Sequence, residues 1–403
     1  MQTAQPETVG LSSARLARLD AALQGYVDRG ELAGVISLLA RRGQLVHASC
    51  CGWADIAARR PLEPDALFRM FSFTKSVTTV ALMMLYEEGR FHLSDPVARF
   101  IPAFGDSQVF VGQTDAGLEL APMERPITLH DLLLHTSGLA YGLFPTTPVE
   151  ALYQEAGILR MDEPLVEKVP RVATLPLAHQ PGKGWTYSVG IDVVGHIVEL
   201  VSGQPLDVFM RERIFEPLGM VDTDFYAPPE KQERLATLYV PGPGGGLLDV
   251  TAVPEANRPP FLVGAWVDKT IKPAFLSGGG GLVSTAADCL RYAMMLLGHG
   301  ELDGARLLGR KTVELMTQNH LPPELPLPAG VGLGLGVTVV TDMARACIPC
   351  STGSYGAGGA AGTEFWVDPQ EEMAGVLMLQ YVSDLPRPVN QDFRVLAAQA
   401  IVD

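Results

Sequence analysis

The chain contains 403 residues, 47% of them hydrophobic, and its formal net charge is −15 at pH 7. A chain of this length and apolar content can bury one large core or two smaller ones. The excess of acidic residues argues against nucleic acid and anionic lipid as partners, and no apolar run approaches the roughly 18 residues that a membrane span needs.

Signals for targeting and for metal binding are weak in this sequence. The first seven residues offer neither the basic nor the apolar region of a signal peptide, which predicts a cytoplasmic protein. Five cysteines are too few and too irregularly spaced for a disulfide framework. Cys347 and Cys350 form a C-x-x-C pair without a second pair or a close histidine, so we interpret them as ordinary loop thiols. We therefore expect no metal and no organic cofactor.

The N-terminal region predicts a helix followed by a β-hairpin. Ser12 or Ser13 can cap a helix that carries a leucine stripe on one side. The continuous apolar run at 35–40 is typical of a strand buried on both faces, and a polar turn connects it to a second strand at 45–51.

Ser72 and Lys75 form the only S-x-x-K sequence in the chain. The run at 77–86 is apolar almost all round, so it predicts a buried helix that ends near Gly89. If Ser72 opens that helix, the Lys75 amine lies one turn later on the same face, where a desolvated neutral lysine can take the serine proton. An S-x-x-K also arises by chance in a chain of this length. Its position at the N-terminus of a predicted core helix favours the catalytic interpretation.

Two further polar side chains lie next to predicted helices. A helix from Thr128 ends at His135, and an imidazole at a helix C-terminus readily bonds backbone carbonyls, so we interpret His135 as structural rather than as a catalytic base. Tyr187 lies at the entry of a later helix that follows the glycine-bearing stretch 181–184. A tyrosine there usually packs in the core, and it matters for chemistry only if it faces Ser72.

The second half of the chain predicts loops and then strands. Residues 226–275 are rich in proline and glycine and predict a long irregular loop. Strands are predicted at 332–341, 363–367 and 373–382, with a closing helix from about Asn390. Strands at both chain ends with helices between them indicate one sheet that both termini complete, with a helical insert.

Four stretches together relate the chain to a known group of proteins. They are 72–75 (SFTK), 134–139 (LHTSGL), 187–189 (YSV) and 357–369 (AGGAAGTEFWVDP). Each stretch is weak evidence alone, but all four occur in this order. The chain resembles the serine β-lactamase and penicillin-binding-protein-like superfamily, and in it the class C β-lactamases and family VIII carboxylesterases most of all.

The resemblance implies an α+β fold, in which helices flank an antiparallel β-sheet built from both chain ends and a mostly helical second domain lies beside it. The expected boundaries are 1–66 for the first part of the α/β domain, 67–276 for the helical domain and 277–403 for the second part of the α/β domain. The site is expected in the cleft between the two domains.

The resemblance also implies the roles of the site residues. Ser72 would be the acylated nucleophile, and Lys75 and Tyr187 would share its proton, the tyrosine passing it to the leaving group and later activating water. The backbone N–H groups of Ser72 and Ala360 would hold the oxyanion. Gly358 and Gly359 would let a substrate lie close along the edge of their strand.

Departures from the β-lactamase pattern point to an esterase. β-Lactamases of this type carry an asparagine two residues after the tyrosine, and this chain has Val189. They also carry a K-T-G triplet whose lysine attracts the antibiotic carboxylate, whereas the triplet here is uncharged, running from Ala357 through Gly358 to Gly359. Loss of a polar clamp and of a cation weakens β-lactam recognition. There is no G-x-S-x-G sequence that would indicate an α/β-hydrolase.

We therefore predict a serine carboxylesterase that hydrolyses small or short-chain acyl esters. An acyltransferase using the same acyl-enzyme, a β-lactamase or D-amino-acid peptidase with weak β-lactam hydrolysis, and a binding protein without activity remain alternatives. Trp185, Phe144 and Phe73 are candidate walls of the substrate pocket, although aromatic residues also pack in cores. The expected partner is a small-molecule ester, and the sequence is compatible with a monomer or a homo-oligomer.

Overall fold

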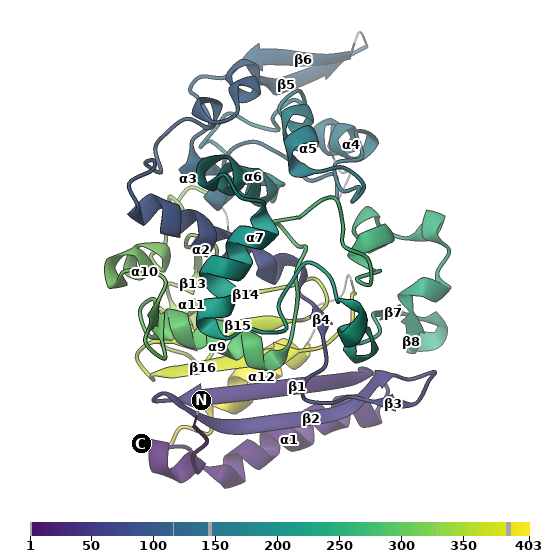
Figure 1. Ribbon diagram of the computed structural model, residues 1–403, viewed down its shortest axis with the longest axis vertical. Helices are drawn as coiled ribbons and strands as arrows, with labels where there is room; N and C mark the ends of the chain where they lie inside the picture. Colours follow the sequence, from purple (N-terminus) through teal and green to yellow (C-terminus); the bar gives the residue numbers. More distant parts are fainter. Residues whose placement is uncertain (1, 116, 144–146, 326, 384–387) are drawn as a thin grey trace.

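The computed structural model describes residues 2–115, 117–143, 147–325, 327–383 and 388–403. At its centre is an eight-stranded antiparallel sheet with the strand order β12-β13-β14-β15-β16-β1-β2-β3 (Figure 1). The strands of this sheet are β1 (Gly34–Arg41), β2 (Gln44–Asp55), β3 (Arg60–Pro61), β12 (Val331–Leu333), β13 (Thr338–Val340), β14 (Tyr355–Gly358), β15 (Glu364–Asp368) and β16 (Met373–Met378). The two chain ends meet where β1 pairs with β16, with Ile36 opposite Met378. This confirms the predicted α+β fold with a sheet built from both ends.

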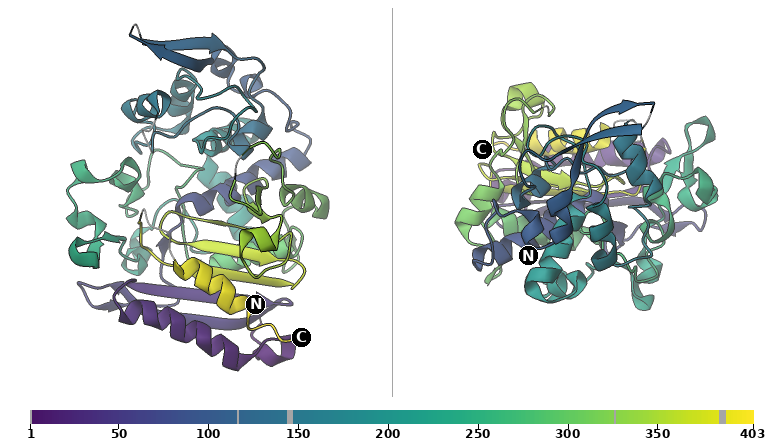
Figure 2. Two further views of the ribbon diagram at one scale, coloured as in Figure 1. Left: turned by 180° about the vertical axis from the view of Figure 1, so that it is seen from behind. Right: turned by 90° about the horizontal axis from the view of Figure 1, so that it is seen from above.

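Helices cover both faces of this sheet. On one face lie α1 (Ser13–Asp28) and α12 (Pro388–Ala398), and on the other lies α9 (Ala286–Leu297), as Figures 1 and 2 show. Because side chains alternate along a strand, Val35 and Leu39 of β1 pack in the cluster under α1, while Ile36 and Ala40 enter the larger core on the opposite face. The continuous apolar run in the sequence therefore corresponds to a strand with two buried faces.

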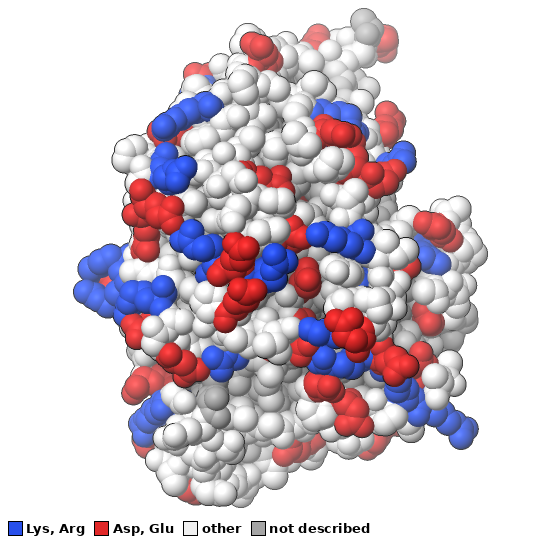
Figure 3. All heavy atoms as spheres, viewed as in Figure 1, with Lys and Arg blue, Asp and Glu red and all other residues white. Residues whose placement is uncertain are grey.

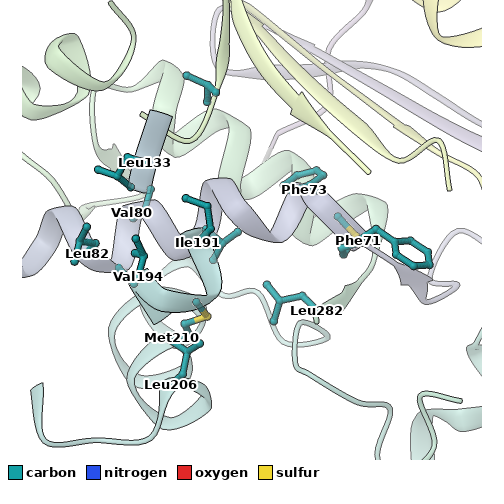
Figure 4. Packing of buried hydrophobic residues seen from close by; sticks show 14 of the residues in the cluster. Phe71, Phe73, Val80, Leu82, Leu133, Ile191, Val194, Leu206, Met210 and Leu282 are labelled. Carbon is teal, nitrogen blue, oxygen red and sulfur yellow. The ribbon is translucent and has the colours of Figure 1, made fainter. Parts of the chain in front are cut away.

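A mostly helical part lies next to the sheet and carries α2 (Thr74–Glu87). Residues 74–85 of α2 are all buried, and the helix packs against α6 (Figure 4). Further helices before residue 220 are α3 (Leu129–Leu134), α4 (Pro148–Glu155), α5 (Leu165–Val172), α6 (Gly190–Ser202), α7 (Leu206–Met210) and α8 (Glu216–Leu218). Two short helices, α10 (Arg310–Met316) and α11 (Met343–Ala346), occur later in the chain. The apolar run that follows the S-x-x-K motif is thus the central helix of the fold.

Within the described part of the chain, four short strand pairs accompany the large sheet. They are β4–β9 (Phe68–Arg69 with Val283–Ser284), β5–β6 (Gln108–Thr114 with Gly117–Pro122), β7–β8 (Tyr239–Pro241 with Leu247–Asp249) and β10–β11 (Glu301–Leu302 with Ala305–Arg306). The pairing of β4 with β9 matters for the site because it brings the glycine run that precedes β9 next to the start of α2.

Residues 226–275 are more ordered than the sequence suggests, since they contain the β7–β8 hairpin and a series of 3-10 turns. Buried cations attach this segment to the core. The Arg69 guanidinium donates to the carbonyls of Ala236 and Val267, each at 2.7 Å, and Lys269 Nζ donates to the Gly281 carbonyl at 2.8 Å. Burial lowers the pKa of Lys269 to about 7. These contacts come from residues far apart in sequence, so local composition did not reveal them.

The surface carries charges of both signs. Figure 3 shows acidic and basic side chains interspersed over one face of the molecule, and some form close ion pairs such as Arg234 with Asp222 at 2.7 Å. Within the described ranges, no helix is long and apolar enough to cross a membrane, and no three side chains of the metal-ligating types gather as a metal site would require.

Candidate active site

Ser72 lies in the short 3-10 turn Phe71–Phe73 that leads directly into α2. Phe71 has φ of +45°, a region that a bulky residue enters at a cost of order 1–3 kcal/mol. Packing maintains this backbone, since the Phe71 ring stacks on Trp266 with centroids 6.5 Å apart and meets Phe261 edge-on at 6.4 Å. The turn and its aromatic support fix the position of the serine at the start of the helix.

The structure brings together the three side chains that the sequence singled out. The Ser72 hydroxyl oxygen accepts hydrogen bonds from Tyr187 OH at 2.6 Å and from Lys75 Nζ at 3.2 Å. Lys75 also lies over the Tyr187 ring, 4.7 Å from its centroid, and its side chain is buried. A serine becomes a strong nucleophile when a neighbouring base takes its proton. A neutral lysine or a phenolate at these distances is within reach for that transfer.

Asp192 binds residues that contact Lys75 and Tyr187, and it was not predicted from the sequence. Its carboxylate accepts hydrogen bonds from Ser277 Oγ at 2.6 Å, Gly279 N–H at 3.0 Å and Tyr141 OH at 3.4 Å. Burial and the adjacent carboxylate hold the pKa of Tyr141 well above its usual range. Tyr141 in turn stacks on Tyr187, with ring centroids 5.5 Å apart. A carboxylate in the otherwise apolar first turns of α6 was the signal that could have identified it.

His135 has a structural role next to Tyr187. It is the C-cap of α3 and has a left-handed backbone with φ of +58°. This agrees with its predicted position at the end of a helix. Its Nδ1 accepts the Ser188 backbone N–H at 3.2 Å and lies 3.1 Å from Ser188 Oγ, so its partners are not the backbone carbonyls that we expected. Burial, aided by the positive charge of Lys75, lowers its pKa to about 3. The imidazole is therefore neutral and holds the segment that carries Tyr187.

The turn that follows β14 lies in close contact with the segment that leads to Ser72. A Cβ at Gly359 would lie 2.0 Å from the Met70 carbonyl oxygen, and Thr363 Oγ1 donates to that same oxygen at 3.1 Å. Gly359 is thus required for contact with the chain that leads to Ser72, a different reason from the substrate approach that we expected. Ala360, the next residue, lines the same pocket as Ser72.

The pocket at Ser72 has a volume of about 160 Å³ and is mainly apolar. Its lining consists of Phe71, Ser72, Tyr141, Leu143, Leu159, Tyr187, Phe261, Trp266, Gly279, Gly280 and Ala360. Most of these residues come from segments in which the sequence showed no motif, because they meet only in the folded chain. None of the described residues that line it is charged.

The residues expected to form pocket walls lie elsewhere. Phe73 points into the core, 4.8 Å from the Phe365 ring, so its assignment to the pocket is corrected (Figure 4). Val189 is 2% exposed at the start of α6. Trp185 is half-buried beside Tyr187, with centroids 6.3 Å apart, and does not line the pocket. Phe144 lies outside the described residues.

The triplet next to Ala360 was also expected to bind substrate. Ala357 is half-buried and pairs with Phe365 in the sheet, and Gly358 is exposed opposite Glu364. Neither lines the pocket around Ser72. Of residues 357–360, Ala360 alone lines this pocket.

Comparisons with known proteins relate the whole chain to one family. A family model described as Beta-lactamase matches residues 19–400. Protein Rv1367c of Mycobacterium tuberculosis is 36% identical over 376 residues, which cover 91% of this chain and 90% of that protein. Esterase EstB of Burkholderia gladioli is 34% identical over 293 residues, 71% of each chain. The solved structure of EstCE1, described as a hydrolase with promiscuous acyltransferase activity, superposes with a TM-score of 0.78 at 27% identity and covers 96% of this chain and 98% of its own.

Proposed function

The chain belongs to the beta-lactamase family, and we propose that it is a serine carboxylesterase that hydrolyses small or short-chain acyl esters through an acyl-enzyme on Ser72. One observation carries the proposal: the Ser72 oxygen lies within hydrogen-bond reach of both Lys75 Nζ and Tyr187 OH, beside a mainly apolar pocket. A nucleophile, a base within reach of it and a pocket beside them for the substrate are the parts that acyl transfer requires.

The mechanism follows from these positions. Ser72 Oγ attacks the ester carbonyl carbon while its proton moves to the Lys75 and Tyr187 pair, and the backbone N–H groups of Ser72 and Ala360 hold the oxyanion. Collapse of this intermediate breaks the bond to the alcohol, which leaves with the proton from Tyr187. A water molecule then loses a proton to the same pair and attacks the acyl carbon, which releases the acid and restores the Ser72 hydroxyl.

The chemistry of the pocket favours esters over β-lactams. An antibiotic carboxylate needs a cation, and none of the described residues that line the pocket around Ser72 is charged; the nearby Lys75 already donates to Ser72 and to the Gly279 carbonyl. Val189 replaces the polar clamp of β-lactamases with a buried apolar side chain. The names of EstB and EstCE1 also support an esterase for this chain.

The decisive experiment compares the wild type with Ser72→Ala on p-nitrophenyl butyrate and on a chromogenic cephalosporin. We expect ester turnover that the mutation abolishes, a mass increase of one butyryl group on Ser72 in the wild type, and little cephalosporin cleavage. Unchanged ester turnover in Ser72→Ala contradicts the mechanism. Rapid cephalosporin cleavage contradicts the preference for esters.

Acyl transfer to an alcohol is a second candidate, and the description of EstCE1 favours it. The acyl-enzyme is common to both reactions, and the outcome depends on whether water or an alcohol attacks it. Addition of an alcohol during ester turnover distinguishes them: a transferase diverts product from the free acid to the new ester, whereas a strict hydrolase yields acid alone.

A further inference from the structure

A large cavity lies on the face of the sheet that is opposite to the site at Ser72. It has a volume of about 590 Å³ and is formed by α12, β15, the turn into β16 and the loop 348–354. Side chains alternate along β15, so Phe365 contacts Phe73 on one face, whereas Trp366 lies on the other face and lines this cavity. The cavity shares no described lining residue with the pocket at Ser72, and we call it the α12 cavity.

Arg394 is the one cation among the described residues that line the α12 cavity. It projects from α12, and its side chain is 23% exposed. Its Nε lies 3.5 Å from the Glu364 carboxylate, at the limit of a hydrogen bond, and among the described residues its two terminal nitrogens have no hydrogen-bond partner. A guanidinium presents its donors as a planar fork that matches a carboxylate. The wall of the cavity therefore offers an unused fork to a ligand.

A second donor in the same wall also lacks an acceptor. Trp366 Nε1 is buried and makes no hydrogen bond within the described part of the chain, on a side chain that is 8% exposed. The ring packs against Phe393, with centroids 6.0 Å apart, so the indole is held in place. Buried N–H groups almost always have a partner, and an exception calls for one from outside the chain.

The two carboxylates in the wall are already satisfied within the protein. Asp368 is buried and accepts three backbone N–H groups at 2.8–3.3 Å. Glu371 forms an ion pair at 2.8 Å with Arg41, which is itself buried and is shared with Asp403. The donors of Arg394 have no such partners. The unmet requirement of the cavity is thus for an acceptor, and one guanidinium balances a single negative charge.

Much of the remaining wall is apolar. It includes Ile348, Met373 and Ile401 in addition to the ring of Trp366. The volume of about 590 Å³ lies in the range of about 300–1,000 Å³ that is typical of sites for small molecules. Apolar walls stabilise the apolar part of a ligand, whereas a second negative charge would lie uncompensated beside Asp368. The wall therefore suits a ligand that combines an apolar body with one carboxylate.

We propose that the α12 cavity is a binding site for a small amphipathic monocarboxylate, such as an ionised medium-chain or aryl-substituted carboxylic acid. The carboxylate of this ligand pairs with the terminal nitrogens of Arg394, and its hydrocarbon part lies against Trp366 and Met373. The site is separate from Ser72, and its existence does not depend on the proposed esterase function.

The indole N–H resonances in a proton–nitrogen correlation spectrum test this site, with decanoate as the probe. The chain has four tryptophans, so Trp366→Phe and Trp266→Phe identify the two resonances that matter. Trp366 reports on the α12 cavity, and Trp266 reports on the pocket at Ser72. We expect decanoate to move the Trp366 resonance saturably, with a Kd below about 1 mM. A Trp366 resonance that does not move, whether or not Trp266 responds, overturns the proposal.

Arg394→Met tests the anchor, because methionine is unbranched and apolar but carries no charge. We expect the Kd for decanoate to rise at least tenfold, as the loss of a hydrogen bond to a charged group predicts, while the spectrum without ligand stays that of the folded protein. The matched control is Arg345→Met, which removes an exposed arginine of α11 outside the lining and leaves the Kd at the wild-type value. An unchanged Kd in Arg394→Met overturns the assignment of the anchor.

Decan-1-ol tests the carboxylate on the wild-type protein, so this comparison does not depend on the folding of any variant. The alcohol has the same hydrocarbon chain as decanoate but no charge. We expect it to move the Trp366 resonance with a Kd at least tenfold higher than that of decanoate. Equal affinities of the alcohol and the acid show that the cavity selects only for apolar character, and they overturn the proposed ligand class.

Discussion

The carbonyl oxygen of Gly279 accepts a hydrogen bond from Lys75 Nζ at 2.5 Å. The N–H of the same glycine donates to Asp192, and the Asp192 carboxylate also binds Tyr141, which stacks on Tyr187. Lys75 and Tyr187 are thus both supported, from different sides, by one buried carboxylate. Asp192 is a positioning residue, since its influence on Ser72 passes through these neighbours.

The substitution Asp192→Asn tests this support. An amide keeps the size of the side chain but loses the charge, and hydrogen bonds to charged groups contribute about 1.5–3 kcal/mol each. We expect kcat for p-nitrophenyl butyrate to fall roughly 10- to 100-fold with little change in KM. The control is Asp288→Asn, another buried carboxylate that accepts a backbone N–H, at Asp222, away from the pocket. A purely structural role for Asp192 predicts equal losses of stability in both variants and an unchanged kcat.

Tyr187→Phe removes the hydroxyl that lies 2.6 Å from Ser72 Oγ. We expect kcat to fall by about 10²- to 10⁴-fold, the usual contribution of a positioned acid or base, because neither the departing alcohol nor the attacking water then has this proton relay. Tyr292→Phe is the control: it removes a buried hydroxyl of α9 that bonds Ser76 of α2 at 2.8 Å, outside the pocket. Near-wild-type activity in Tyr187→Phe contradicts the role of the phenol.

Gly359→Ala tests the close contact between the strand end and the nucleophile segment. The added Cβ would lie 2.0 Å from the backbone oxygen of Met70, so the segment leading to Ser72 or the strand leading to Ala360 has to move. A displacement of about 1 Å in a catalytic site can reduce the rate by around 10²-fold, and we expect a loss of that size in kcat/KM. Gly246→Ala, where nothing lies within 4 Å of the added atom, is expected to match the wild type. Retention of full activity in Gly359→Ala rules out a tight fit here.

The buried imidazole of His135 makes stability depend on pH. Its pKa is about 3 in the folded protein, lowered chiefly by burial, against an ordinary value of 6.5 in the unfolded chain. The unfolded state therefore binds a proton between pH 6.5 and 3 that the folded state does not, so stability falls as the pH falls through this window and is unaffected above about pH 7. From pH 7.5 to 5.5 this contributes a loss of about 1.4 kcal/mol in the free energy of unfolding.

Urea denaturation of His135→Asn at these two pH values measures the contribution. Asparagine tolerates the left-handed backbone of this position and does not titrate. We expect the variant to lose about 1.4 kcal/mol less than the wild type over the interval. His299→Asn is the matched control, because His299 has a φ of +54° but is exposed. Equal losses in wild type and His135→Asn show that the imidazole already titrates normally in the folded protein.

Much of the candidate site was predictable because local spacing determines it. Ser72 and Lys75 are one helical turn apart, and an apolar run immediately after them forces the helix into the core, so their contact at 3.2 Å needs little more than helix geometry. Phe73 shows the limit of the same reasoning. It is adjacent to the nucleophile in sequence, yet the turn at Phe71 directs it toward Phe365, away from the pocket.

The amino-acid sequence was sufficient to predict a buried strand at 35–40, a core helix after Ser72, and the order of motifs that indicated the family. These depend on periodicity and short-range spacing, which a linear chain displays directly. The folded chain alone shows that Asp192 supports Lys75 through Gly279, and that Leu159 and Trp266, joined by a hydrogen bond, both line the pocket at Ser72. Such contacts join residues as many as 204 positions apart, and their partners are selected by packing of the whole core rather than by any local pattern.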